Sequence, residues 1–159
     1  MSLDIVSKEE IQVIGISEVT NNQDEMSGTG KIGGLWNRFF ADGILDKIPN
    51  KKEPANIFAV YTDYESDETG NYRILIGAEV KDVSSVPEGM ILRKIPKGSY
   101  SKFTSGNGKI AEVAVAVWQK IWANVELKSK RAYLADYELY DQRSSNPETA
   151  QIDVFIGVK

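Results

Sequence analysis

Two stretches of the chain space their apolar residues as an amphipathic helix does. The first runs from about Thr29 to Ile48, and the second runs from Lys109 to about Val125. In both stretches apolar side chains recur at three- and four-residue steps, which places them on one side of a helix. We therefore expect two long helices, each burying one face.

Shorter stretches are predicted as β-strands, because they are rich in apolar, aromatic and β-branched residues and are separated by turn-forming residues. They cover about residues 10–19, 57–64, 72–80, 90–95, 98–103, 134–141 and 152–158. The polar segments 21–25 and 65–71 are expected to be connections. The predicted order is strand, helix, strand, strand, and it occurs twice.

Short segments recur along the chain in the same order. Residues 28–32, Gly-Thr-Gly-Lys-Ile, return as Gly-Asn-Gly-Lys-Ile at 106–110, and Ile76-Gly77 returns as Ile156-Gly157. These two matches are offset by 78 (106 − 28) and 80 (156 − 76) residues, and Tyr61 would match Tyr140 at an offset of 79 (140 − 61). These matches indicate a duplication. We expect one α+β domain over residues 1–159, built from a β-α-β-β unit at about 8–82 and a second at about 89–159. The two antiparallel sheet halves would be related by a pseudo-two-fold axis, and the seam between them is a natural ligand site.

The strand at residues 134–141 carries an unusual charge. Side chains alternate across a strand, so Leu134, Asp136, Glu138 and Tyr140 share one face. Burying a carboxylate costs several kcal/mol unless a partner compensates. If this face is inward, Glu138 needs a cation, a hydrogen-bonding network, a proton or a ligand. Periodicity alone favours the alternative, in which Glu138 faces solvent or pairs with a Lys or Arg, because charged residues are mostly exposed.

Composition narrows the chemistry. The 159 residues suit one domain, and they include no cysteine and no histidine. Ser-His-Asp and Cys-His catalysis and metal sites built on His or Cys are therefore excluded. The net charge of −4 gives no cationic footprint for nucleic acid. With neither a signal peptide nor a membrane span recognisable, we expect a cytoplasmic protein that has no metal and no cofactor.

Five aromatic residues lie on the two predicted helices, namely Trp36, Phe39, Phe40, Trp118 and Trp122. Most of them are expected in the core. Tryptophan rarely fills a core completely, however, and its indole N–H needs a partner. One or two of these side chains could therefore line a pocket.

The chain resembles the gyrase-inhibitor-like effector-binding domains of AraC-type and MerR-type multidrug-responsive regulators. The resemblance covers the whole chain and rests on the order and spacing of several motifs. They are Gly34-Leu35-Trp36-x-x-Phe39, Tyr61-Thr62-Asp63-Tyr64, Gly77 with Val80, Ile95-Pro96-x-Gly98-x-Tyr100, Trp118-x-x-Ile121-Trp122, Asp136-Tyr137-Glu138-x-Tyr140-Asp141 and Ile156-x-Val158-Lys159.

The resemblance implies a pocket for lipophilic, cationic small molecules at the repeat seam, with an acidic residue at its base and aromatic walls. The matching acid is Glu138, and the matching walls are Tyr140, Tyr61, Trp36, Tyr100, Trp118 and Phe39. No helix-turn-helix segment is recognisable, so direct DNA binding is not expected. The chain looks like the free-standing type found on integron cassettes. This resemblance implies a role in drug sensing or transcription regulation, with a separate DNA-binding protein as a candidate partner.

Two other functions stay open. Some relatives are thought to hydrolyse strained electrophiles, in which case Glu138 would be the general base and a tyrosine the proton donor. The family name also suggests a protein that blocks a topoisomerase. A net charge of −4 over 159 residues is weak support for DNA mimicry.

Overall fold

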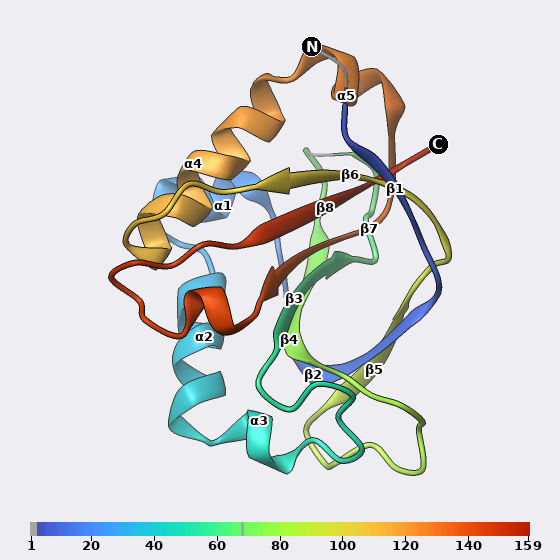
Figure 1. Ribbon diagram of the computed structural model, residues 1–159, viewed down its shortest axis with the longest axis vertical. Helices are drawn as coiled ribbons and strands as arrows, with labels where there is room; N and C mark the ends of the chain where they lie inside the picture. Colours follow the sequence, from blue (N-terminus) through green and yellow to red (C-terminus); the bar gives the residue numbers. More distant parts are fainter. Residues whose placement is uncertain (1–2, 68) are drawn as a thin grey trace.

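Eight strands form one antiparallel sheet in the computed structural model, which describes residues 3–67 and 69–159 (Figure 1). The strands are β1 (Ile5–Lys8), β2 (Ile11–Thr20), β3 (Ile57–Thr62), β4 (Tyr72–Glu79), β5 (Ile91–Ile95), β6 (Gly98–Thr104), β7 (Arg131–Tyr140) and β8 (Asp153–Val158). The helices are α1 (Asn22–Ser27), α2 (Ile32–Ala41), α3 (Ile44–Lys47), α4 (Ile110–Ala123), α5 (Val125–Lys130) and the 3-10 turn η1 (Gln142–Ser144). Glu68, in the predicted connection 65–71, lies outside the described residues. Residues 1 and 2, at the N-terminus where no signal peptide is expected, also lie outside them.

The strand order is β1-β6-β8-β7-β3-β4-β2-β5. The counterparts are β1 and β5, β2 and β6, β3 and β7, and β4 and β8. Exchanging the members of each pair reverses the order of the strands. This is the symmetry expected of a duplicated β-α-β-β fold. The axis passes between β3 and β7, where Ala59 lies opposite Glu138 and Tyr61 opposite Asp136. Ala59 and Glu138 are also 79 residues apart (138 − 59), the offset that relates Tyr61 to Tyr140. Glu138 and its counterpart therefore meet at the centre of the sheet.

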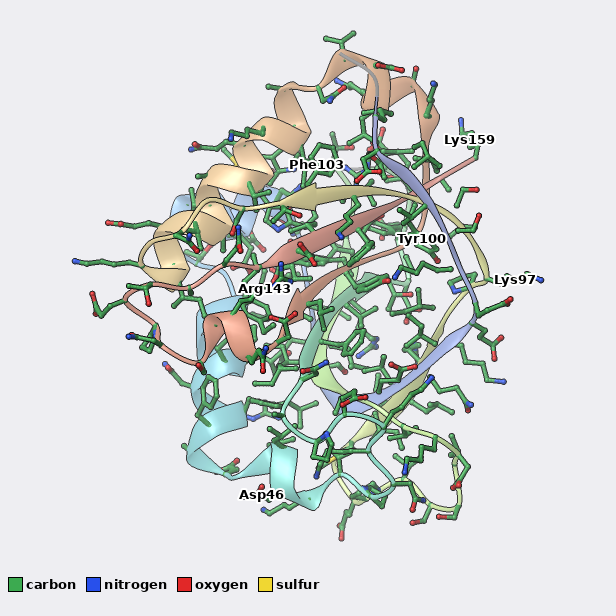
Figure 2. All side chains as sticks on the ribbon, in the orientation of Figure 1. Asp46, Lys97, Tyr100, Phe103, Arg143 and Lys159 are labelled. Atoms are coloured by element: carbon green, nitrogen blue, oxygen red, sulfur yellow. The ribbon has the colours of Figure 1, made fainter. Side chains whose placement is uncertain are left out.

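Two short connections curl the sheet into a half-barrel. Glu9-Glu10 links β1, at one edge, to β2, near the other edge, and Pro96-Lys97 links β5 to β6 in the same way. Two residues reach only about 10 Å between strand ends, so the edges must approach each other at this end of the sheet. An ion pair of 3.7 Å between Lys97 and Glu9 joins the two connections, and Figure 2 shows Lys97 on the side away from α2 and α4.

Glycines let the curled strands approach closely. Gly15 of β2 lies opposite Gly77 of β4, and a Cβ on Gly77 would lie 1.9 Å from the carbonyl oxygen of Ile14. Gly157 is the counterpart of Gly77, and its Cβ would lie 2.8 Å from the carbonyl oxygen of Ala135. No other residue type fits such spaces.

The two faces of the sheet carry two separate apolar clusters. The helices cover one face, where the buried residues of α2 and α4 (among them Leu35, Phe39, Val117 and Ile121) pack on β2, β3, β4, β7 and β8 (Figure 1). The inner face of the half-barrel holds the second cluster, which includes Phe58, Tyr137 and Phe155 and, among the described residues, no helix residue. Tyr137 stacks on Phe155 with ring centroids 4.7 Å apart.

The predicted fold class and most elements are confirmed, with some corrections. The long helix expected at 29–48 is two helices, because Asp42 and Gly43 interrupt it and Gly43 adopts a left-handed conformation with φ 59°. The segment expected as a polar connection at 21–25 forms α1, capped by the Asn21 side chain. Strand β1 and helix α5 were not predicted. Within the described ranges, no helix is both long and apolar enough to cross a membrane.

Candidate functional site

Glu138 lies near the C-terminal end of β7 and points to the helix-covered face of the sheet. Only 3% of its surface is exposed. Alternation along β7 places it between Asp136 and Tyr140, both also buried, whereas the strand's bulge leaves Leu134 exposed. The solvent-facing alternative for Glu138, which periodicity favours, is therefore wrong.

Neutral donors surround the Glu138 carboxylate. The Trp118 indole donates a hydrogen bond of 2.6 Å and the Tyr61 hydroxyl one of 3.0 Å to Oε2, and the Tyr140 hydroxyl donates one of 2.7 Å to Oε1. Among the described residues, no Lys or Arg forms an ion pair with Glu138. A carboxylate has about four acceptor positions, so room remains at Oε1 for a further donor or a cation.

Burial governs the titration of this cluster. Desolvation raises the pKa of Glu138 above its usual value of 4.5, although the bonds from Trp118, Tyr140 and Tyr61 lower it in part. Burial, followed by the proximity of the Glu138 charge, raises the pKa of Tyr61 and Tyr140 well above the usual value, so both stay protonated donors. Glu138 is therefore a buried acid whose charge is not balanced by any cation in the described part of the chain.

Glu138 opens onto a cavity of about 230 Å³ between the sheet and the helices. The sheet side of the cavity is mostly aromatic and consists of Tyr61, Tyr64, Tyr72, Glu138 and Tyr140. Tyr61 packs edge-on against Trp118 with ring centroids 5.1 Å apart, and Tyr140 packs edge-on against Trp36 at the same distance. The two repeats thus contribute equivalent tyrosines to opposite sides of the carboxylate.

The helices complete the cavity wall. Helices α2 and α4 contribute Ile32, Trp36, Ala114, Val115, Trp118 and Trp122. Helix α1 adds Asn22 and Glu25. Asn22 accepts a hydrogen bond of 3.0 Å from the Tyr72 hydroxyl, and Glu25 accepts one of 2.7 Å from the backbone N–H of Lys31, at the start of α2. Helix α1 is therefore attached both to the sheet and to α2.

Of the predicted ligand-binding residues, Glu138, Tyr140, Tyr61, Trp36 and Trp118 come together around this cavity. Tyr100 and Phe39 do not line it. Tyr100 belongs to the cluster on the other face of the sheet, where it packs edge-on against Tyr137 and its hydroxyl donates to the carbonyl of Pro96 (Figure 2). Phe39 is 1% exposed and packs beneath Trp36 in the core.

Several cavity residues were not predicted from sequence. Tyr64 stands in a motif that carried the family resemblance, and Trp122 lies on the apolar stripe of α4, so both had a signal. Asn22 and Glu25 had none, because their segment reads as a polar connection. Arg131 had none either, because nothing in its neighbourhood marks it as buried.

Arg131 forms a second charged group at the edge of the cavity. It pairs with Asp136 at 2.7 Å, and both side chains are buried. Asp136 also accepts hydrogen bonds from the Tyr64 hydroxyl and from the backbone N–H of Gly157, so its charge is fully compensated. Glu138 differs from Asp136 in that respect, although the two carboxylates are only two residues apart. Among the described residues no group of three or more acidic side chains is arranged to hold a metal ion.

Comparison with known proteins matches the chain to an effector-binding family and to relatives that are named as transcriptional regulators. Residues 4–158 match the family model for the integron-associated effector binding protein, Cass2. A proposed transcriptional regulator of Bacillus subtilis, YobU, is 29% identical over 147 residues, which cover 91% of this chain and 90% of YobU. The transcriptional regulator BrlR of Pseudomonas aeruginosa is 30% identical over 131 residues, but these cover 80% of this chain and only 46% of BrlR.

Solved structures agree with this placement. An integron cassette protein from the mobile metagenome of Vibrio cholerae superimposes with a TM-score of 0.79 at 26% identity, covering 99% of this chain and 95% of the other. The protein SAV2435, solved bound to tetraphenylphosphonium, gives a TM-score of 0.81 at 15% identity, covering 100% and 94% of the two chains, and so shares the fold. With the family model spanning nearly the whole sequence, the chain belongs to the integron-associated effector-binding protein family.

Proposed function

We propose that this protein binds lipophilic aromatic cations in the cavity at the repeat seam, with Glu138 as the anion that selects them. The observation that carries the proposal is the Glu138 carboxylate itself. It is buried and hydrogen-bonded by neutral groups, and no Lys or Arg within residues 3–67 and 69–159 forms an ion pair with it. A cationic ligand would supply the missing partner.

The walls of the cavity suit such a ligand. A charge held in a low-dielectric interior attracts a cation more strongly than a charge in water does. The faces of Trp36, Trp118, Tyr61 and Tyr140 can each add about 0.5–2 kcal/mol by cation–π contact. A delocalised organic cation also loses little hydration on entering. The structural neighbour SAV2435 was solved with a ligand of this class, tetraphenylphosphonium.

The role that follows is that of a drug sensor acting in transcription regulation. The family is described as effector-binding, and YobU and BrlR are named as transcriptional regulators. We propose that the protein acts in the cytoplasm and that a separate DNA-binding protein reads its ligand-bound state, since the net charge of −4 offers no surface for nucleic acid.

The test is a pair of ligands that have the same shape and opposite charge. Tetraphenylphosphonium and tetraphenylborate would be titrated separately into the protein, with tryptophan fluorescence reporting binding through Trp36 and Trp118. We expect micromolar binding of the phosphonium and none of the borate. Equal binding of the two ions, or binding of neither, would contradict the proposal.

Glu138→Gln is the matching variant, because it keeps the shape of the side chain and removes the charge. We expect it to lose at least tenfold in phosphonium affinity, or about 1.4 kcal/mol. Glu148→Gln removes the same charge from an exposed turn and should bind as the unmodified protein does. A Glu138→Gln protein that binds normally would mean that the cavity is merely apolar.

Hydrolysis of a strained electrophile is the second candidate function. It is favoured by one observation, the raised pKa of Glu138 beside two protonated tyrosine hydroxyls, which suits a general base and its proton donors. Turnover of an epoxide-type substrate by the wild type, abolished in Glu138→Gln, would establish it.

A further inference from the structure

A second cavity adjoins the first. It has a volume of about 300 Å³ and shares Asn22, Trp122 and Arg131 with the Glu138 cavity. Ligand pockets for drug-sized molecules usually measure roughly 300–1,000 Å³. The Glu138 cavity alone falls below that range, at about 230 Å³, whereas the two cavities together fall within it. A drug-sized ligand therefore has reason to occupy both.

The second cavity has the opposite electrostatic character. Its ionised lining groups among the described residues are Arg131 and Lys128, and no described carboxylate lines it. Lys128 is exposed to solvent and Arg131 is buried, so Arg131 is the cation that this cavity encloses. The Glu138 cavity, by contrast, presents the carboxylate that we propose as the cation site.

Arg131 has unused hydrogen-bonding capacity. It is 6% exposed, and its Nη2 donates to Asp136 at 2.7 Å, but its Nε has no hydrogen-bond partner among the described residues. A buried donor without a partner is unfavourable, and Arg131 lines both cavities, so an acceptor on a ligand can supply the missing partner. The planar guanidinium also matches a carboxylate better than an ammonium would.

Side chains of opposite charge thus line the Glu138 cavity. Arg131 and Glu138 line the same cavity, so a single ligand can contact both. We infer that the two cavities form one site for amphoteric aromatic compounds, in which the cationic end lies at Glu138 and an acceptor such as a carboxylate lies at Arg131. The inference rests on the proposed cation site and specifies the kind of molecule that fills it.

Rhodamine B and its ethyl ester test this inference directly. They share the same cationic ring system, but only rhodamine B carries a free carboxylate at neutral pH. A site with Glu138 alone should prefer the ester, because the ester has a net positive charge. A site that also uses Arg131 should bind rhodamine B at least fivefold more tightly, as measured by fluorescence anisotropy. Equal affinities, or tighter binding of the ester, would overturn the inference.

Two variants separate the inference from the function on which it rests. Glu138→Gln should weaken both dyes if the cation site is right, whichever dye binds better. Arg131→Lys keeps a charge that can reach Asp136 but removes the Nε donor, so it should lower the preference for rhodamine B and leave the ester nearly unchanged. An undiminished preference in Arg131→Lys would contradict the assigned contact. If neither dye binds the wild type, the cation site and the inference fail together, and this wild-type comparison stands even if the variant is unstable.

Discussion

The buried charge of Glu138 works against the stability of the folded protein. Its three hydrogen-bond donors are neutral, and they only partly offset the loss of hydration. Asp136, on the same strand, avoids this cost through its ion pair with Arg131. Functional sites commonly contain residues that lower stability, so the cost of burying Glu138 supports a role for it in binding.

Removing this charge should make the protein more stable. A raised pKa means that the folded state holds the Glu138 proton more tightly than the unfolded chain does. The contribution of Glu138 to stability is therefore complete below its unfolded value near 4.5 and is lost as the pH rises through the folded value. We expect Glu138→Gln to be more stable than the wild type at pH 7.5, by about 1 kcal/mol or more, and equally stable at pH 4.

Urea denaturation at the two pH values measures the difference. Asp63 and Asp141 have lowered pKa values, because Arg93 and Arg143 respectively hydrogen-bond to them, and they destabilise both proteins equally in acid. They therefore cancel when the variant is compared with the wild type. A glutamine oxygen in the Oε2 position can keep the Trp118 and Tyr61 bonds. A variant that is less stable at pH 7.5 would show that the hydrogen bonds outweigh the buried charge.

At the scale of elements, the curl of the sheet depends on the glycine pair in β2 and β4. Gly15 and Gly77 face each other without side chains, so the backbones approach closely. The direct pairing of β3 with β7 places Tyr61 and Glu138 beneath α4 at hydrogen-bonding distance.

A methyl group at this crossing should disrupt the fold. In Gly77→Ala the new Cβ would lie 1.9 Å from a backbone oxygen that cannot move aside without breaking the sheet. We expect a loss of about 3 kcal/mol or more in the free energy of unfolding, at or beyond the upper end of overpacking costs. Gly98→Ala, at the start of β6, meets open space and should cost less than about 1 kcal/mol. Similar losses in the two variants, measured by urea denaturation, would contradict this account of the curl.

Elements that bury few apolar residues could not be predicted from the periodicity of the sequence. Helix α1 has six residues and buries none of them, so it has no apolar stripe to detect. It is held instead by its Asn21 cap and by the contacts that Asn22 and Glu25 make with Tyr72 and with the start of α2. Its place in the cavity wall is consequently invisible in the sequence.

At the scale of the whole molecule, the site joins the two repeats. Tyr61 and Trp36 come from the first repeat, and Glu138, Tyr140 and Trp118 come from the second. Since β3 and β7 are neighbours at the centre of the sheet, a ligand here contacts both halves of the fold. Binding should therefore stabilise the two halves together.

Hydrogen exchange provides the test. At a tetraphenylphosphonium concentration 100 times its dissociation constant, the fold should gain about 2.7 kcal/mol. We expect slower exchange at the backbone amides of both β3–β4 and β7–β8, because sub-global opening of either half would release the ligand. Protection confined to one half, or the same protection in Glu138→Gln, would show that the ligand lies elsewhere.

Several features of the fold and of the site could be predicted from the sequence alone. The apolar stripe of α4, the strand alternation that puts Glu138 on one face with Tyr140, and the 79-residue offset between Tyr61 and Tyr140 all follow from local geometry. The offset also agrees with the observed register, in which Ala59 lies opposite Glu138. These features need no knowledge of what packs against each element.

Which faces are inward and which side chains meet depends on how the elements pack together. Alternation groups residues by face but does not say which face is covered, so it could place neither Tyr100 inside the half-barrel nor Glu138 beneath α4. The burial of Arg131 depends on Asp136 and on a bulge in β7, and the wall formed by α1 depends on contacts between segments about 50 residues apart. Burial and charge compensation are properties of the assembled fold, because each depends on the neighbours that folding brings together.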